Sequence, residues 1–149
     1  MYRLTVVFII LILVASALCA DLQTAERIAN SHILMSGRGD DFVIKDHEII
    51  NRNNANILYI FDLEPAGFIA ISGAKVIRPV LGYSYENSLD KTLDSPGYDF
   101  LIHSAKLRYE KLVSENRELE TLRIRNRALW QDYLEMEQSL HRELLDGVW

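Results

Sequence analysis

Apolar segments in the middle of the chain predict a small antiparallel sheet. The strongest strand signals are Ile57–Leu63, which is rich in β-branched and aromatic residues, and Phe68–Ser72. The turn between them, Glu64–Gly67, favours pairing of these two strands as an antiparallel hairpin. Residues 42–52 before the hairpin and 80–84 after it have the composition of further strands, so we expect a sheet of about four strands.

Apolar residues at helical spacing predict helices before and after this sheet. Asp21 is expected to cap a helix that starts at Leu22 and ends before Gly37. From Tyr98 to Val113 the apolar residues step by three and four, and after a weaker stretch the rhythm resumes. We favour two helices there, with a break near Asn116. The predicted class is α+β: a small antiparallel β-sheet packed against an N-terminal helix and C-terminal helices.

The last part of the chain, residues 116–149, is interpreted as a charged helical C-terminal extension. Its dense charges are typical of a solvated helix face. Its apolar positions follow a heptad seam with one polar member, Asn126, which can set the register of paired helices. The seam positions are Leu119, Leu122, Asn126, Leu129, Tyr133, Met136 and Leu140.

Residues 1–20 have the form of a secretory signal sequence. An apolar core, Leu4–Val14, is followed by small residues, and cleavage is expected after Ala20. An uncleaved membrane anchor is disfavoured because the apolar stretch is short and no stop-transfer pattern follows. A lipoprotein modified at Cys19 is disfavoured because Leu18 is not small. The expected location is secreted or periplasmic, with no stable membrane insertion after cleavage.

The charge and cysteine content narrow the classes of partner and chemistry. The 149-residue chain has a formal net charge of −5, and loss of the signal sequence removes Arg3 and makes it more acidic. Phosphate backbones repel such a chain, so nucleic acid is not an expected partner. The single cysteine would leave with the signal sequence, so the mature protein is expected to have no disulfide and no thiolate nucleophile.

The sequence contains no self-contained active site. The segment Asp46-His47-Glu48 groups metal-binding side chains, but neighbouring residues of a strand point to opposite faces, so a solvated strand face is the preferred interpretation and a metal site stays an open alternative. No two histidines are spaced as a helical zinc pair; they are His32, His47, His103 and His141.

Two further short motifs have ordinary structural explanations. Ser72 ends a strand without the flanking glycines of a nucleophile elbow, which favours a turn serine over a hydrolase. The tripeptide Arg38-Gly39-Asp40 can be read by integrins, but its composition is that of a common turn. We therefore expect a protein that is not an enzyme, needs no cofactor and acts by surface contact.

Four consecutive motifs resemble one known family. They are Tyr59–Asp62, Gly67–Gly73, Pro79–Ser84 and Asn87–Asp90, and they are similar to the propeptide domain of streptopain-like cysteine peptidases and to the related Spi-type inhibitors. The resemblance extends from Leu22 to Val113, which gives an inhibitor-like domain over residues 21–115. The motif positions, for which we prefer structural roles in turns and packing, are Tyr59, Phe61, Gly67, Phe68, Ser72, Gly73, Pro79, Gly82 and Tyr83.

The resemblance implies a function. In this family the domain covers the active-site cleft of a papain-like cysteine peptidase, and the contact comes from the segment between the last strand and the next helix. Here that segment is Thr92–Gly97, and the candidate contact residues are Asp94, Ser95, Pro96 and Gly97. A loop held at both ends loses little entropy when it inserts into a cleft. The expected function is that of a secreted inhibitor or a detached prodomain.

Two other functions stay open. The first is a secreted interaction module without inhibitory activity, in which the C-terminal helix drives self-association into a homo-oligomer. The second is a truncated cysteine-peptidase zymogen, which the abrupt end Gly147-Val148-Trp149 would fit.

Overall fold

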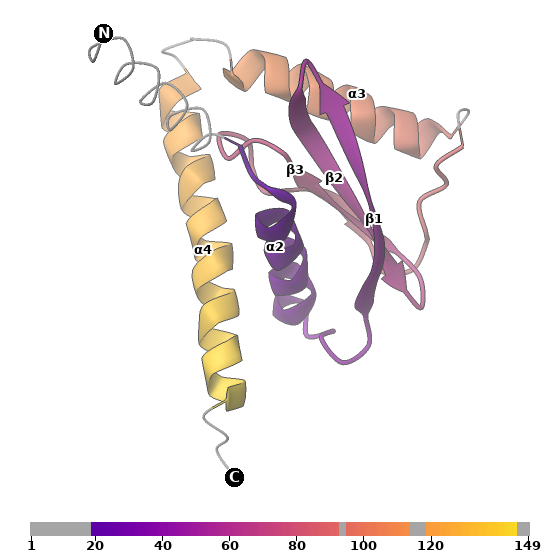
Figure 1. Cartoon of the computed structure of the whole chain (residues 1–149), viewed down its shortest axis with the longest axis vertical. Coiled ribbons are helices and arrows are strands. Elements are labelled where there is room, and N and C mark those ends of the chain that lie inside the picture. Colours follow the sequence, from indigo (N-terminus) through magenta and orange to yellow (C-terminus); the bar gives the residue numbers. More distant parts are fainter. Residues whose placement is uncertain (1–18, 93–94, 114–118, 146–149) are drawn as a thin grey trace, which may run out of the picture.

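The computed structural model describes residues 19–92, 95–113 and 119–145 (Figure 1). Within these residues the fold is α+β, as the sequence predicts, with one antiparallel sheet and helices before and after it. The elements in chain order are α2 (Leu22–Met35), β1 (Val43–Arg52), β2 (Ala55–Glu64), β3 (Phe68–Ser72), β4 (Val80–Ser84), α3 (Pro96–Val113) and α4 (Glu120–Leu145).

The sheet has four strands in the order β1-β2-β3-β4, and each neighbouring pair is antiparallel. The predicted hairpin is confirmed, because Leu58 pairs with Ser72 and Phe61 pairs with Ile69. Gly67 turns the chain between these strands with a φ of 111°, a conformation that side chains with a Cβ rarely adopt. A Cβ at this position would also lie 2.3 Å from the carbonyl oxygen of Ser84.

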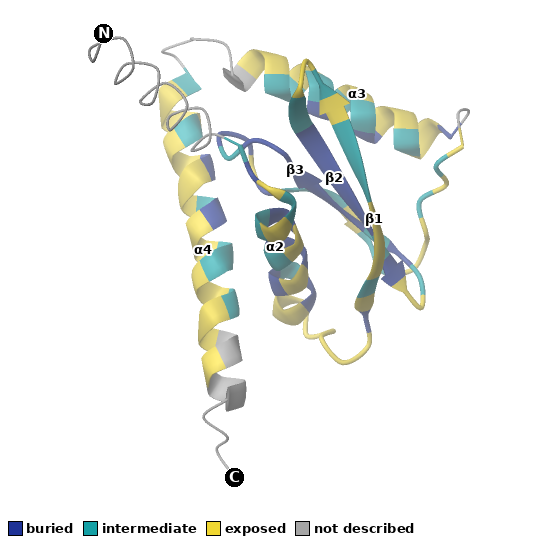
Figure 2. Ribbon diagram, viewed as in Figure 1, coloured by how far each residue is buried: buried dark blue, intermediate teal, exposed yellow. Residues whose placement is uncertain are grey.

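Each face of the sheet has its own hydrophobic core. On one face Phe61 of β2 packs in a buried cluster with Ile28 of α2. On the other face Ile60 packs in a cluster with Leu101 of α3. The alternation follows from the pleat, which sends successive side chains of β2 to opposite faces. Figure 2 shows the buried residues concentrated on the central strands and on the helix surfaces that face them.

The predicted N-terminal helix is confirmed, together with its cap. The Asp21 side chain accepts a hydrogen bond of 2.7 Å from the Thr24 backbone N–H, and Leu22 is the first residue of α2. The carboxylate is stabilised by this bond, which lowers the pKa of Asp21. The helix ends at Met35, and Gly37 follows with a φ of 71°, the left-handed conformation expected after a helix.

The C-terminal region contains two helices, as predicted, and the second packs on α2 (Figure 1). Trp130 of α4 is buried, and its Nε1–H donates a hydrogen bond of 2.8 Å to the carbonyl oxygen of Ile77. Asn126, one turn earlier, donates from Nδ2 to the carbonyl oxygen of Val76 at 2.8 Å. The position of the predicted break near Asn116 lies outside the described residues.

An ion pair also joins the two helices, between Arg27 of α2 and Glu137 of α4. Arg27 donates from Nε to the Glu137 carboxylate at 2.7 Å, and its Nη2 lies 2.6 Å from the same oxygen. Ser31 adds a hydrogen bond of 3.0 Å from its hydroxyl to the carbonyl oxygen of Tyr133. Apolar burial, an ion pair and hydrogen bonds therefore hold α4 in a fixed position beside α2.

Candidate functional site

The connector, residues 85–95, joins the end of β4 to the start of α3. Residues 85–92 are exposed or half-buried, whereas Ser95 is 8% exposed. In Figures 1 and 2 residues 85–92 of the connector lie on the right of the sheet, on the opposite side of the view from α4. Residues 85–92 therefore form a surface segment that another protein can contact.

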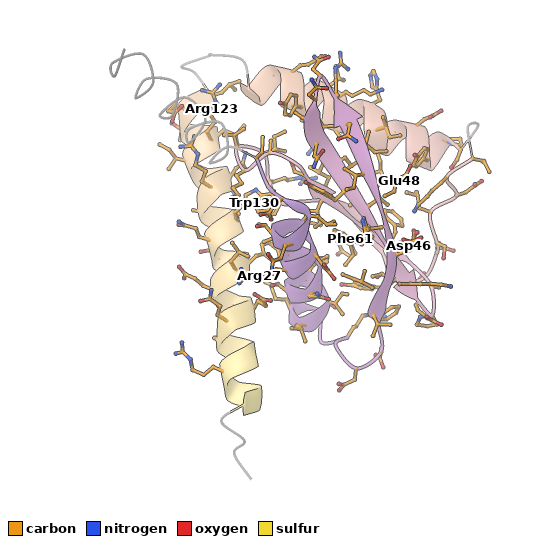
Figure 3. The ribbon with its side chains drawn as sticks, in the orientation of Figure 1. Arg27, Asp46, Glu48, Phe61, Arg123 and Trp130 are labelled. Atoms are coloured by element: carbon orange, nitrogen blue, oxygen red, sulfur yellow. The ribbon has the colours of Figure 1, made fainter. Side chains whose placement is uncertain are left out.

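Contacts of Lys91 and Tyr98, on either side of residues 92–97, hold the connector against the sheet. Lys91 of the connector lies 2.6 Å from Asp62 Oδ2 on β2, and its Nζ is 3.8 Å from Glu48 Oε2 on β1. From the other end, the hydroxyl of Tyr98 in α3 donates to Glu48 Oε1 at 2.6 Å. Figure 3 places Glu48 on β1 beside α3. One flank of the connector is thus tied mainly to β2 through Asp62, and the other is tied to β1 through Glu48.

Glu48 has capacity for one further interaction. Its Oε2 is buried and accepts no hydrogen bond among the described residues, apart from the longer ion-pair contact with Lys91. The hydroxyl of Tyr98 is partly desolvated, and its hydrogen bond to a charged carboxylate favours the protonated form. Burial first and then this bond raise the pKa of Tyr98 to about 12. Tyr98 is therefore a hydrogen-bond donor to Glu48 throughout the neutral pH range.

Local hydrogen bonds order residues 84–92. The Ser84 hydroxyl accepts bonds from the N–H groups of Glu86 and Asn87, at 3.2 and 3.0 Å. Asp90 accepts a bond of 3.0 Å from the Thr92 N–H, which stabilises the carboxylate and lowers the pKa of Asp90. These bonds form turns of the kind that Ser and Asp side chains make with the backbone. Residues 84–92 thus have a defined shape before any partner binds.

The helix after the connector begins earlier than the sequence pattern suggests. We predict its start at Tyr98, but the structure places Pro96 and Gly97 in the first turn of α3, with Ser95 just before it. Proline is favoured at this position because its fixed φ suits a helix and its missing N–H needs no partner. The Asp99 N–H donates to the carbonyl oxygen of Ser95 at 3.0 Å, which closes that first turn.

The four candidate contact residues have different exposures. Pro96 and Gly97 are exposed on the first turn of α3, while Ser95 is buried behind them. Asp94 lies outside the described residues. A Cβ on Gly97 would meet only Leu89 Cδ1, at an ordinary contact distance of 3.8 Å, so the site has space for a side chain. Pro96 and Gly97 therefore form an accessible edge at the end of the connector.

Several motif residues are buried and carry the fold. Tyr59 and Phe61 are fully buried in the core below α2. The hydroxyl of Ser72 donates to the carbonyl oxygen of Ala74 and accepts from its N–H, both at 3.1 Å. A Cβ on Gly73 would lie 1.8 Å from the carbonyl oxygen of Asn56, so only glycine allows this approach. Ser72 is engaged in a buried turn and is not presented as a nucleophile.

The other motif residues described on or beside the last two strands differ in burial. Phe68 and Gly82 are half-buried, and a Cβ on Gly82 would lie 3.1 Å from a methyl group of Leu101 in α3. Pro79 is buried directly before β4, at a strand start where its missing N–H costs no ladder bond. Tyr83 packs edge-on against His32 of α2, with ring centroids 4.4 Å apart, yet it stays 54% exposed.

The structure assembles no metal centre among the residues it describes. His47 lies on the α2 side of β1, near Phe61, whereas Glu48 turns to the α3 side and binds Tyr98. The Asp46 carboxylate accepts a hydrogen bond from the His47 backbone. Within the same described ranges, the helices are too short or too polar to cross a membrane.

The predicted heptad seam of α4 is divided between the interior and the surface. Asn126 is buried and bonded to Val76, and Tyr133 packs against the core that α2 shares with the sheet. Leu122 and Met136 of the same series are 42% and 39% exposed. Sequence reasoning missed Trp130, which lies outside the seam but is the most deeply buried side chain described on this helix.

The sequence matches the family described as Spi protease inhibitor over residues 17–109. This range includes the whole sheet, the connector and most of α3. The match covers more than half of the chain, so this chain belongs to the Spi protease inhibitor family. The family recognised from the four sequence motifs is thereby confirmed. No curated protein and no solved structure matches the sequence.

Proposed function

We propose that this protein inhibits a papain-like cysteine peptidase of the streptopain type. The connector and the exposed edge formed by Pro96 and Gly97 would lie across the active-site cleft of the peptidase and exclude its substrate. Membership of a family of protease inhibitors supports the inhibitory role. The peptidase type is inferred from the resemblance of the strand motifs, which this family shares with streptopain propeptides.

One observation carries the proposal: carboxylates of the sheet hold side chains on both flanks of the connector. Lys91 pairs with Asp62 on one flank and Tyr98 binds Glu48 on the other, where Pro96 and Gly97 are exposed. Binding is stronger when a loop is already ordered, because less conformational entropy is lost on association. Anchoring at Lys91 and Tyr98 therefore lowers the entropy lost when this region binds a partner.

The proposed location of this activity rests on the predicted signal sequence. We propose that the protein is exported and meets its target peptidase outside the cytoplasm. The target can be encoded separately, in which case the protein acts as a free inhibitor. Alternatively, the protein is a detached prodomain, and its target is the catalytic domain to which such a prodomain is otherwise joined. In both cases the inhibitory contact is the same.

The test is inhibition of a purified streptopain-like peptidase by the purified full chain. We expect inhibition at micromolar or lower concentration, competitive with a peptide substrate. The variant Gly97→Trp fills the exposed edge of α3 and is expected to weaken inhibition at least about tenfold, since a misplaced bulky group prevents close contact. Ala128→Trp, at an exposed position of α4, is the matched control and should inhibit like the unchanged protein.

The design separates loss of binding from loss of folding. Both variants place the same side chain on an exposed helix position, so both should unfold at the same urea concentration as the unchanged protein. Absence of inhibition across a panel of streptopain-like peptidases would contradict the proposed function. Equal inhibition by Gly97→Trp would contradict the assigned contact surface while leaving the inhibitory activity in place.

A further inference from the structure

We infer that the signal sequence is cut between Ala17 and Leu18, so that Cys19 and Ala20 remain part of the mature inhibitor. This inference rests on the proposed export of the protein. Cleavage after Ala20, which the small residues at the end of the signal sequence suggest, would remove two residues that the structure incorporates into the domain.

Ala20 belongs to the folded domain. It is 3% exposed and is a member of the core cluster between the sheet and α2. Its N–H donates a hydrogen bond of 2.9 Å to the carbonyl oxygen of Gly73. Cys19 forms an antiparallel bridge with Ala74 beside it. Residues 19 and 20 thus pair, as a short strand-like segment, with residues 73 and 74 directly after β3.

The carbonyl group of Ala20 completes a buried hydrogen-bond chain. The hydroxyl of Tyr59 is fully enclosed and donates to this carbonyl oxygen at 2.8 Å, while Asn56 Nδ2 donates to the same hydroxyl at 2.8 Å. Without Ala20 the Tyr59 hydroxyl would lose its only acceptor among the described residues. Buried polar groups in folded proteins are nearly always paired, so this contact indicates that Ala20 is retained.

Cleavage after Ala20 would also place a new positive charge at an unfavourable position. The new α-amino group would be that of Asp21, the cap of α2. The N-terminal end of a helix carries a partial positive charge from its free N–H groups, and a second positive charge there is repelled. With Leu18 as the first residue, the terminal amine lies three residues away from the cap.

The sequence contains a better cleavage site at the inferred junction. Signal peptidases select small residues at the last and third-to-last positions before the cut. Ala15-Ser16-Ala17 satisfies both positions, whereas Leu18-Cys19-Ala20 has leucine at the third-to-last position. The family match itself begins at residue 17, so it takes in the residues that the inference retains.

The test is the intact mass of the full chain after export from a bacterial host. The expected product begins at Leu18 and, once unfolded, gains one carbamidomethyl group from iodoacetamide on Cys19. A product that begins at Asp21 and takes no label would overturn the inference while leaving the proposed export standing. A chain that is not cut at all would overturn both.

Two single substitutions distinguish the two junctions independently of mass. Ala17→Gln places a large residue directly before the inferred cut and should abolish processing, whereas it is four residues from a cut after Ala20. Leu18→Gln follows the inferred cut and should be processed normally, whereas it would block a cut after Ala20 by occupying the third-to-last position. The reverse pattern of processing would overturn the inference.

Discussion

The hydroxyl of Tyr98 donates a hydrogen bond of 2.6 Å to the carboxylate of Glu48, across the space between α3 and the edge strand β1. The same carboxylate faces Lys91 of the connector at 3.8 Å. Glu48 therefore contacts side chains on both sides of the segment that we assign to the inhibitory contact, while Asp62 holds Lys91 more closely, at 2.6 Å.

Replacing Glu48 by alanine should weaken inhibition without unfolding the protein. The substitution releases Tyr98 while the pair between Lys91 and Asp62 remains, so the start of α3 must be ordered when it binds. We expect the inhibition constant to rise about five- to tenfold, because a region that is no longer anchored loses conformational entropy when it binds. The measurement is the inhibition constant against the same streptopain-like peptidase.

Arg52→Ala is the matched control for Glu48→Ala. Arg52 lies on the same strand and pairs with Glu110 of α3, so this variant also breaks a contact between β1 and α3. It does not touch the connector, and inhibition should be unchanged within about twofold. An equal loss in both variants would show that general loosening of α3, and not the anchoring of the connector, controls binding.

Removing the hydroxyl of Tyr59 should destabilise the fold. Tyr59→Phe leaves the aromatic ring in the core but deprives the Ala20 carbonyl and the Asn56 amide of their shared partner. We expect the free energy of unfolding to fall by about 1–2 kcal/mol, the usual consequence of leaving buried polar groups unpaired. Urea denaturation followed by circular dichroism measures this, and an unchanged midpoint would argue against the buried hydrogen-bond chain.

Truncating Trp130 should show that α4 is part of the folded unit. Trp130→Ala removes a buried ring and its hydrogen bond to Ile77, and we expect a loss of about 3–5 kcal/mol. Ile124→Ala, on the same helix but at a position that is 60% exposed, should change stability by less than about 0.5 kcal/mol. Similar effects of the two substitutions would mean that α4 does not pack on the domain as described.

Acidification should destabilise the protein through His32. Burial among Tyr83, Tyr85 and Tyr133 lowers the pKa of His32 below the ordinary value of 6.5, and its Nε2 is buried without a hydrogen-bond partner. The unfolded chain therefore binds more protons than the folded chain, so stability falls as the pH drops through the ordinary value. The shifts of Asp21 and Asp90 act only in more acidic solution.

The measurement is the urea midpoint at about pH 7.5 and about pH 5.5. We expect a lower midpoint at the acidic pH for the unchanged protein and a smaller difference for His32→Gln. His103 is exposed on α3, so His103→Gln serves as control and should keep the full pH dependence. A stability that increases on acidification would contradict the burial of a neutral His32.

The sequence predicted those elements whose formation depends on interactions between residues that are close together in the chain. The hairpin of β2 and β3 was predictable from two apolar segments and a short turn, and the Asp21 cap from its position before an apolar series. The start of α3 was placed two residues late, because Pro96 and Gly97 look like loop residues although proline suits the first turn of a helix.

The contacts that anchor the connector could not be predicted. Glu48 and Tyr98 are 50 residues apart in the sequence, and Lys91 and Asp62 are 29 apart. Their meeting depends on how α3 crosses the sheet, which no local pattern specifies. Trp130 was missed for a related reason: a heptad assumes a partner helix, whereas α4 packs on its own domain and buries a different residue.

The most direct test of the proposed inhibition is protection of the active-site cysteine of a streptopain-like peptidase. Iodoacetamide alkylates this thiol at a rate that reports whether the cleft is open. With saturating inhibitor we expect the rate to fall at least about tenfold, and to recover when Gly97→Trp replaces the unchanged protein, because a blocked cleft excludes small reagents as well as substrate. An alkylation rate that stays the same at every concentration of the chain would contradict the account.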